Sequence, residues 1–164
     1  MAHPASAEDR TPDGTDDPCM GRRFVDPDLI CLNGDGKSTL RGSRCGQCAA
    51  TTFPAQSSCP RCAATDMSIH PLPRRGVLWT YTIQRFRPKT PYDGPTEFEA
   101  YPVGYVNLGD EVLVESRLSA PPDRAPRIGE AMELIFTPYT RRADGDTVRT
   151  FAFRALAEGG GEKP

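Results

Sequence analysis

The stretch that decides the fold is CGQCAATTFPAQSSCPRC, residues 45–62, which holds four of the chain's six cysteines. They form two Cys-x-x-Cys pairs, Cys45/Cys48 and Cys59/Cys62, with ten residues between the pairs. Such a turn lets two sulfurs converge on one ion, and zinc prefers four tetrahedral ligands, thiolates among them. The pattern therefore predicts a rubredoxin-like zinc ribbon in which these four cysteines bind the metal.

Other uses of the cysteines fit the spacing less well. An iron centre on four thiolates has the same geometry, so iron remains an alternative to zinc. A redox dithiol needs only one such pair, usually in a βαβ setting that this sequence lacks. A catalytic zinc site keeps one position open for water or substrate, whereas four cysteines close the shell. We therefore expect the metal to stabilise a segment that has almost no apolar core of its own.

Downstream of the cysteines, apolar and aromatic residues alternate with polar ones in five segments that turn sequences separate. The predicted strands are residues 76–86, 101–108, 111–118, 131–136 and 148–156. The alternation groups residues that we expect to pack in the core: Val77, Trp79, Tyr81 and Ile83 in the first strand, and Tyr101, Val103 and Tyr105 in the second. Five strands with no helical period between them predict a small OB-fold barrel.

The chain thus divides into four parts. We expect a flexible or partly ordered N-terminal segment, the zinc ribbon, the OB-fold and a flexible tail, at residues 1–40, 41–73, 74–157 and 158–164. No run approaches the ~20 apolar residues of a membrane span. The N-terminus has neither the basic region nor the apolar region of a secretory signal. These features predict a cytoplasmic protein.

The charge balance argues against a polyanionic partner. The chain has 20 Lys and Arg against 22 Asp and Glu, and the barrel segment 74–157 has 12 against 11. An OB barrel that binds nucleic acid usually shows a larger basic excess. Because the fold itself permits such binding, a nucleic-acid-binding ribbon and OB module remains the alternative function.

The residues assemble no catalytic constellation. The chain has two histidines, and we predict His70 to be an exposed linker residue. We interpret the turn carboxylates Asp110 and Glu111 as solvated charges. One basic cluster, Arg85, Arg87 and Lys89, opens the long loop between the first two predicted strands. Its cations could bind the phosphates of a small ligand, with a solvated loop as the alternative.

The order of these parts resembles a known family. The segments LRGSRCGQCAATTFPAQSSCPRC, GVLWTYTIQRF, YPVGYVNLGDEVLVESRL and IGEAMELIF look like the zinc-ribbon OB-fold proteins formerly called domain of unknown function 35. The resemblance runs from about Leu40 to Leu156. Its more specific features are the Gly-Ser-Arg lead-in to Cys45 and the Phe53-Pro54 pair.

The resemblance implies a function that composition does not. Members of this family are typically accessory subunits of thiolase-like enzymes: β-ketothiolases, acyltransferases and thiolase-like aldolases that act on acyl-CoA. It implies that the ribbon docks on the partner and that the barrel helps to form the CoA channel, while the partner carries out the chemistry. The cluster of Arg85, Arg87 and Lys89 would then contact CoA, which carries phosphates. We therefore expect a non-catalytic subunit of a heteromeric complex.

Overall fold

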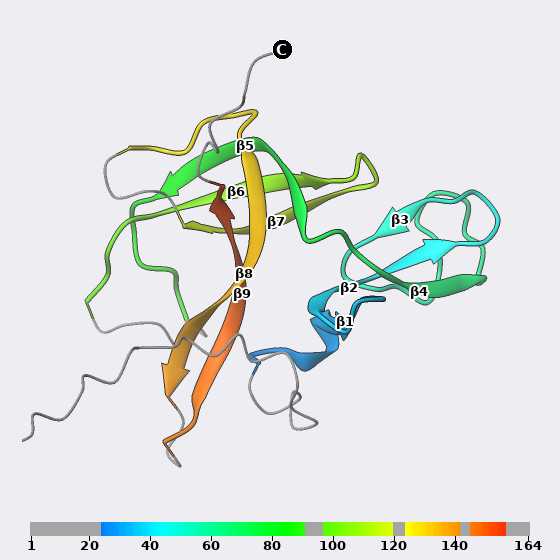
Figure 1. Ribbon diagram of the computed structural model, residues 1–164, viewed down its shortest axis with the longest axis horizontal. Helices are drawn as coiled ribbons and strands as arrows, with labels where there is room; N and C mark the ends of the chain where they lie inside the picture. The colour runs from blue at the N-terminus through cyan, green and yellow to red at the C-terminus, as the bar shows by residue number, and fades with distance from the viewer. Residues whose placement is uncertain (1–23, 91–96, 120–123, 142–144, 157–164) are drawn as a thin grey trace, which may run out of the picture.

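The computed structural model describes residues 24–90, 97–119, 124–141 and 145–156. Figure 1 shows two lobes, a barrel and a smaller ribbon beside it. The elements are a 3-10 turn at Pro27–Leu29 and the strands β1 (Ile30–Leu32), β2 (Ser38–Cys45), β3 (Thr51–Thr52), β4 (Met67–Pro71), β5 (Arg75–Gln84), β6 (Tyr101–Leu108), β7 (Val112–Ser119), β8 (Ala131–Arg141) and β9 (Thr147–Ala155). The described residues are therefore mainly β, as the alternation predicts.

The ribbon is organised around β2, which pairs antiparallel with β1, β3 and β4. Polar contacts fill its interior. Ser43 is buried between β3 and β4, where its hydroxyl lies 2.8 Å from that of Thr52 and accepts a bond from the Gln56 amide at 2.9 Å. Hydrogen-bonded hydroxyls hold a unique geometry but bury little apolar area. The ribbon therefore depends on something other than the hydrophobic effect.

The second lobe is a closed barrel in the order β5-β6-β7-β9-β8, with β8 returning to β5 through pairs such as Gly76↔Met132. All its neighbours are antiparallel except β7 and β9, which are parallel. Five strands closed in this way form an OB-fold, which confirms the predicted fold class.

One hydrophobic core joins the two lobes. Leu78, Leu134 and Phe153 fill the barrel, and each is fully buried. Leu40 and Leu72, from the base of the ribbon, belong to the same cluster with exposures of 0% and 2%. The base of the ribbon is therefore packed against the barrel, and only its far end projects.

The structure corrects the predicted face of β5. A β-bulge separates the pairs Leu78↔Val106 and Thr80↔Tyr105, with Trp79 as the extra residue. Such a bulge reverses the alternation along a strand. Before and at the bulge, Val77 and Trp79 are 46% and 57% exposed with Leu78 between them in the core, whereas beyond the bulge Tyr81 packs against the core as predicted.

The predicted inner face of β6 is wrong for a different reason. Gly104, Val106 and Leu108 are the buried residues, whereas Tyr105 is exposed and Val103 is half-buried. The odd-numbered and the even-numbered residues of this strand are both rich in apolar side chains, so alternation alone does not predict which set faces the core. The set with the smaller side chains faces inward. A Cβ on Gly104 would clash with the Thr80 carbonyl oxygen, so this position requires glycine.

Candidate functional site

Two equivalent turns carry the four cysteines. In each turn the backbone carbonyl oxygen of the first cysteine accepts a hydrogen bond from the amide four residues later. The Ala49 amide donates to the Cys45 carbonyl at 3.0 Å, and the Ala63 amide donates to the Cys59 carbonyl at 2.9 Å. Both alanines have a positive φ, 57° and 60°. Side chains other than Gly rarely take this conformation, so the surrounding structure must impose it. The repeated Cys-x-x-Cys-Ala-Ala sequence is thus a local signal beyond the cysteines themselves.

The turns bring four sulfurs to one point. The Sγ atoms of Cys45 and Cys62 lie 3.7 Å apart, those of Cys48 and Cys59 lie 3.6 Å apart, and all four lie within 4.8 Å of one another. A tetrahedron with metal–sulfur bonds of about 2.3 Å has edges of about 3.8 Å. The donor set therefore fits one tetrahedral metal ion, and zinc and iron fit it equally well by geometry.

The thiols favour a bound cation electrostatically. Backbone amides, first that of Cys62 and then that of Arg61, lower the pKa of Cys59 to about 6. The Ala64 amide also lowers the pKa of Cys62, but bonds with the neighbouring thiols dominate and raise it to about 12. The thiolates of Cys59 and Cys62 thus disfavour each other, and a bound metal ion would supply the compensating positive charge. Because all four positions are sulfur, the site is closed and structural in type.

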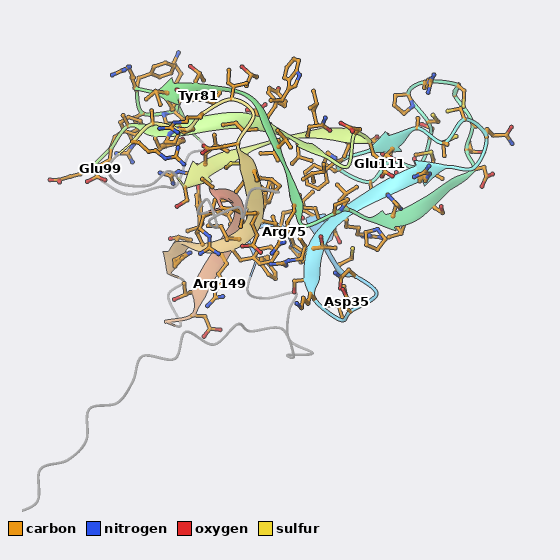
Figure 2. All side chains as sticks on the ribbon, turned by 45° about the horizontal axis from the view of Figure 1, so that its top comes forward. Asp35, Arg75, Tyr81, Glu99, Glu111 and Arg149 are labelled. Atoms are coloured by element: carbon orange, nitrogen blue, oxygen red, sulfur yellow. The ribbon has the colours of Figure 1, made fainter. Side chains whose placement is uncertain are left out.

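Glu111 links the ribbon to the barrel. It lies in the turn between β6 and β7 and faces the ribbon (Figure 2). Its carboxylate accepts bonds from His70 Nε2 at 2.8 Å, Arg44 Nη1 at 3.0 Å and Thr51 Oγ1 at 3.5 Å. These donors lower the pKa of Glu111, the His70 bond most strongly, while partial burial opposes them. Glu111 is exposed, as predicted for a solvated charge, but its charge is paired. The prediction of His70 as an exposed linker residue is wrong, because it is half-buried in β4 and bonded to Glu111.

The basic loop lies away from the cysteines. Arg85, Arg87 and Lys89 are all exposed and follow the end of β5, on the side of the barrel farthest from the ribbon (Figure 1). Between two of these cations stands Phe86, which is 71% exposed and whose carbonyl accepts a bond from Gln84 Nε2. The structure therefore shows two separate candidate regions, a metal centre and a cationic loop.

A third region was not predicted from the sequence. The outer face of β5, β6 and β7 exposes Val77, Trp79, Tyr105 and Leu113. Polar groups on this face bond one another, since Tyr105 Oη donates to Glu115 at 2.8 Å. The alternation grouped most of these residues correctly, but the sequence did not show that Val77, Trp79 and Tyr105 face outward.

The described residues contain no helix that is long and apolar enough to cross a bilayer.

Comparisons with known proteins agree with this architecture. Residues 37–68 match the rubredoxin-like zinc ribbon domain of ChsH2, and residues 70–137 match its C-terminal OB-fold domain. The benzoylsuccinyl-CoA thiolase subunit BbsA of Thauera aromatica is 29% identical over 137 residues, which cover 81% of this chain and 88% of BbsA.

A solved structure described as Ltp2-ChsH2(DUF35) aldolase has a similar fold. Its TM-score is 0.54 with 20% identity, over 73% of this chain and 86% of the other. At that identity the likeness concerns the fold alone. The two domain matches together span more than half of the sequence, in the order that the structure shows. The chain therefore belongs to the ChsH2 family of zinc-ribbon OB-fold proteins, the family formerly called domain of unknown function 35.

Proposed function

We propose that this protein is a non-catalytic accessory subunit of a thiolase-superfamily enzyme that acts on acyl-CoA in the cytoplasm. The observation that carries the proposal is the similarity to BbsA, a thiolase subunit, over 88% of its length. Because ribbon and barrel both align, the likeness concerns the whole subunit rather than a shared metal motif. The enzyme would be a β-ketothiolase, an acyltransferase or a thiolase-like aldolase.

The metal centre has a structural role in this proposal. Cys45, Cys48, Cys59 and Cys62 would hold Zn²⁺, which supplies folding free energy to the ribbon. The sulfurs would be fully used by the ion and unavailable as nucleophiles. His70, the one histidine among the described residues, is bonded to Glu111. These assignments support a division of labour in which the partner carries the reacting groups.

The surface of β5, β6 and β7 is our candidate for docking the thiolase-like subunit. Trp79 and Tyr105 are the residue types that most often dominate binding energy at interfaces, and Val77 and Leu113 flank them. Leu113 lies two residues after Glu111, so this surface begins beside the ribbon. We therefore propose that ribbon and barrel contact the partner together.

The cationic loop is our candidate for contact with CoA. Arg85, Arg87 and Lys89 are exposed at one end of the barrel, where the diphosphate and 3′-phosphate of CoA could be bound by guanidinium and ammonium groups. Replacing Arg85 and Lys89 with Ala should raise the KM of the complex for acyl-CoA several-fold. An unchanged KM would remove these residues from the site.

Coexpression with a thiolase-like protein encoded next to this chain tests the proposal. Size-exclusion chromatography with light scattering should show a heteromeric complex, and acyl-CoA turnover should require both proteins. Trp79→Ser should weaken the complex roughly 30-fold or more. Val25→Ser, which changes an exposed apolar residue beside β9, is the matched control and should leave binding unchanged.

Two outcomes would overturn the proposal. Turnover of acyl-CoA by this chain alone would make it an enzyme in its own right. Tight binding to single-stranded nucleic acid that falls steeply between two salt concentrations would favour the nucleic-acid-binding alternative.

A further inference from the structure

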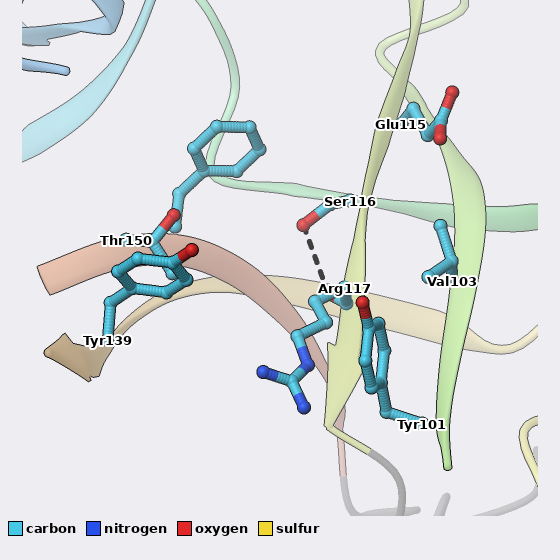
Figure 3. Close-up of a pocket in the computed structure, with 8 residues that line it drawn as sticks. Tyr101, Val103, Glu115, Ser116, Arg117, Tyr139 and Thr150 are labelled. Carbon is cyan, nitrogen blue, oxygen red and sulfur yellow. Dashed lines mark hydrogen bonds between the residues drawn. The ribbon is translucent and has the colours of Figure 1, made fainter. Parts of the chain in front are cut away.

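The barrel wall contains a cleft between β7 and β9. These strands pair only at Leu118↔Phe153 and Ser119↔Arg154. On the N-terminal side of these pairs the two strands diverge, and a cleft of about 310 Å³ opens between them. Figure 3 shows its two walls, with Tyr101 and Arg117 on one side and Tyr139 and Thr150 on the other.

Arg117 is held in this cleft by an aromatic ring. Its guanidinium carbon lies 3.7 Å from the centroid of the Tyr101 ring, which is a stacked cation–π contact. Stacking covers one face of the guanidinium and leaves the N–H groups along its edges free to point outward. Within the described residues, no carboxylate forms an ion pair with Arg117. The cleft therefore presents a positioned cation that no carboxylate of the described residues contacts directly.

The remaining lining sets the size and charge of a ligand. Phe151, Val103 and the Tyr139 ring give apolar surface, and the volume is at the lower end of the range for small-molecule sites. Glu115 also borders the cleft, although its carboxylate already accepts a bond from the Tyr105 hydroxyl. One cation beside one carboxylate gives no net positive charge, which disfavours a polyanion such as nucleic acid.

We propose that this cleft binds a small organic anion, a carboxylate or a phosphate monoester joined to a flat apolar group. The oxyanion would take the outward N–H edge of Arg117, where bidentate bonding is available. The flat group would lie against Phe151 and Tyr139. All the lining residues belong to one chain, so binding needs no thiolase-like subunit, and this site is independent of the proposed function.

NMR titration of the full-length, metal-loaded chain tests the proposal, using the Nε–Hε resonance of Arg117. Benzoate and phenyl phosphate are the two probes, since they share the ring and differ in the oxyanion. At least one should shift this resonance saturably with a dissociation constant of about 1–10 mM. Benzamide, which keeps the ring and lacks the charge, should bind at least tenfold more weakly, as should inorganic phosphate, which lacks the ring.

Two variants separate the cleft from general charge effects. Arg117→Gln should weaken binding of the preferred probe at least tenfold. Arg75→Gln removes an equally charged, exposed side chain that pairs with Glu133 outside the cleft, and it should leave binding unchanged. Well-dispersed spectra of both variants would show that they are folded.

Three results would overturn the inference. The first is benzamide binding as tightly as both anions, which would make the cleft merely apolar. The second is undiminished probe binding by Arg117→Gln. The third is a short oligothymidylate shifting the cleft resonances at far lower concentration than either probe, which would make the cleft a nucleic-acid site. Formation of the complex with a thiolase-like subunit is measured separately, so this inference can fail while the proposed function stands.

Discussion

Replacing Glu111 with Gln should loosen the ribbon on the barrel. The change removes the charge that His70 and Arg44 bond at 2.8 and 3.0 Å and keeps the size of the side chain. The three groups are partly exposed, so each of the two charged pairs contributes about 0.2–1 kcal/mol, and the loss should total about 0.4–2 kcal/mol of unfolding free energy. For a chain of this length each kcal/mol shifts Tm by about 2–4 °C, which predicts a decrease of about 1–8 °C.

A double-mutant cycle measures this contact directly. Thermal unfolding of Glu111→Gln, His70→Gln and the double variant should give a coupling free energy of about 0.5–1 kcal/mol. Glu115→Gln is the matched control, because that carboxylate on β7 loses a single bond from Tyr105 and does not touch the ribbon. A coupling of zero within error would refute the reasoning and return Glu111 to the solvated role that its turn position first indicated.

The pH dependence of the same contact has a definite sign. The folded protein lowers the pKa of Glu111, so the contact contributes fully above the unfolded value of about 4.3 and is lost as pH falls through the folded pKa. The stability difference between Glu111→Gln and the unmodified chain should therefore be present at pH 5 and should shrink as the pH falls below about 4.3 and through the lowered pKa of folded Glu111. Glu115→Gln at each pH corrects for metal loss, which affects all three proteins alike.

Three further predictions concern the ribbon and the core. Chelation or Cys48→Ser should unfold the ribbon tip and weaken partner binding; unchanged protease resistance of residues 41–73 would contradict this. Leu134→Ala should lower the unfolding free energy by about 2–5 kcal/mol in denaturant titrations, because the side chain is fully buried. A loss below 1 kcal/mol would show that the surrounding core relaxes to fill the cavity and would contradict the prediction. Gly76→Ala would press a Cβ against the Asn107 carbonyl oxygen and should cost about 1–3 kcal/mol, whereas Gly34→Ala meets open space and should cost little; equal effects would refute the packing argument.

Features encoded by nearby residues could be predicted from the sequence. The metal ligands lie within 18 residues of one another, and each Cys-x-x-Cys turn sets its own geometry, so composition and spacing were sufficient. The existence, order and approximate bounds of the barrel strands followed from alternation. Alternation gave only part of the inner face of β5, because the bulged residue Trp79 shifts the alternation, so that Tyr81 packs against the core while Val77 is exposed.

Contacts between distant residues could not be predicted in this way. Glu111 and Arg44 are 67 positions apart, and Arg117 meets Tyr101 only because β6 and β7 pair with Val103 opposite Arg117. Nothing in the spacing of these residues signals the pairing register. A turn carboxylate and a strand arginine are ordinary surface residues until the fold brings their partners beside them.

Different interactions stabilise the two ends of the ribbon. At its base, Leu40 and Leu72 belong to the barrel core, and the Arg74 guanidinium donates to the carbonyls of Ser38 and Leu134. Residues 41–71, all of them described, bury no apolar side chain larger than cysteine. The barrel therefore holds the base and the metal holds the tip, with Glu111 between them. The core at the base and the bonds of Glu111 together give the tip a defined position relative to the β5–β6–β7 face. A partner that binds both surfaces, as we propose, would require this.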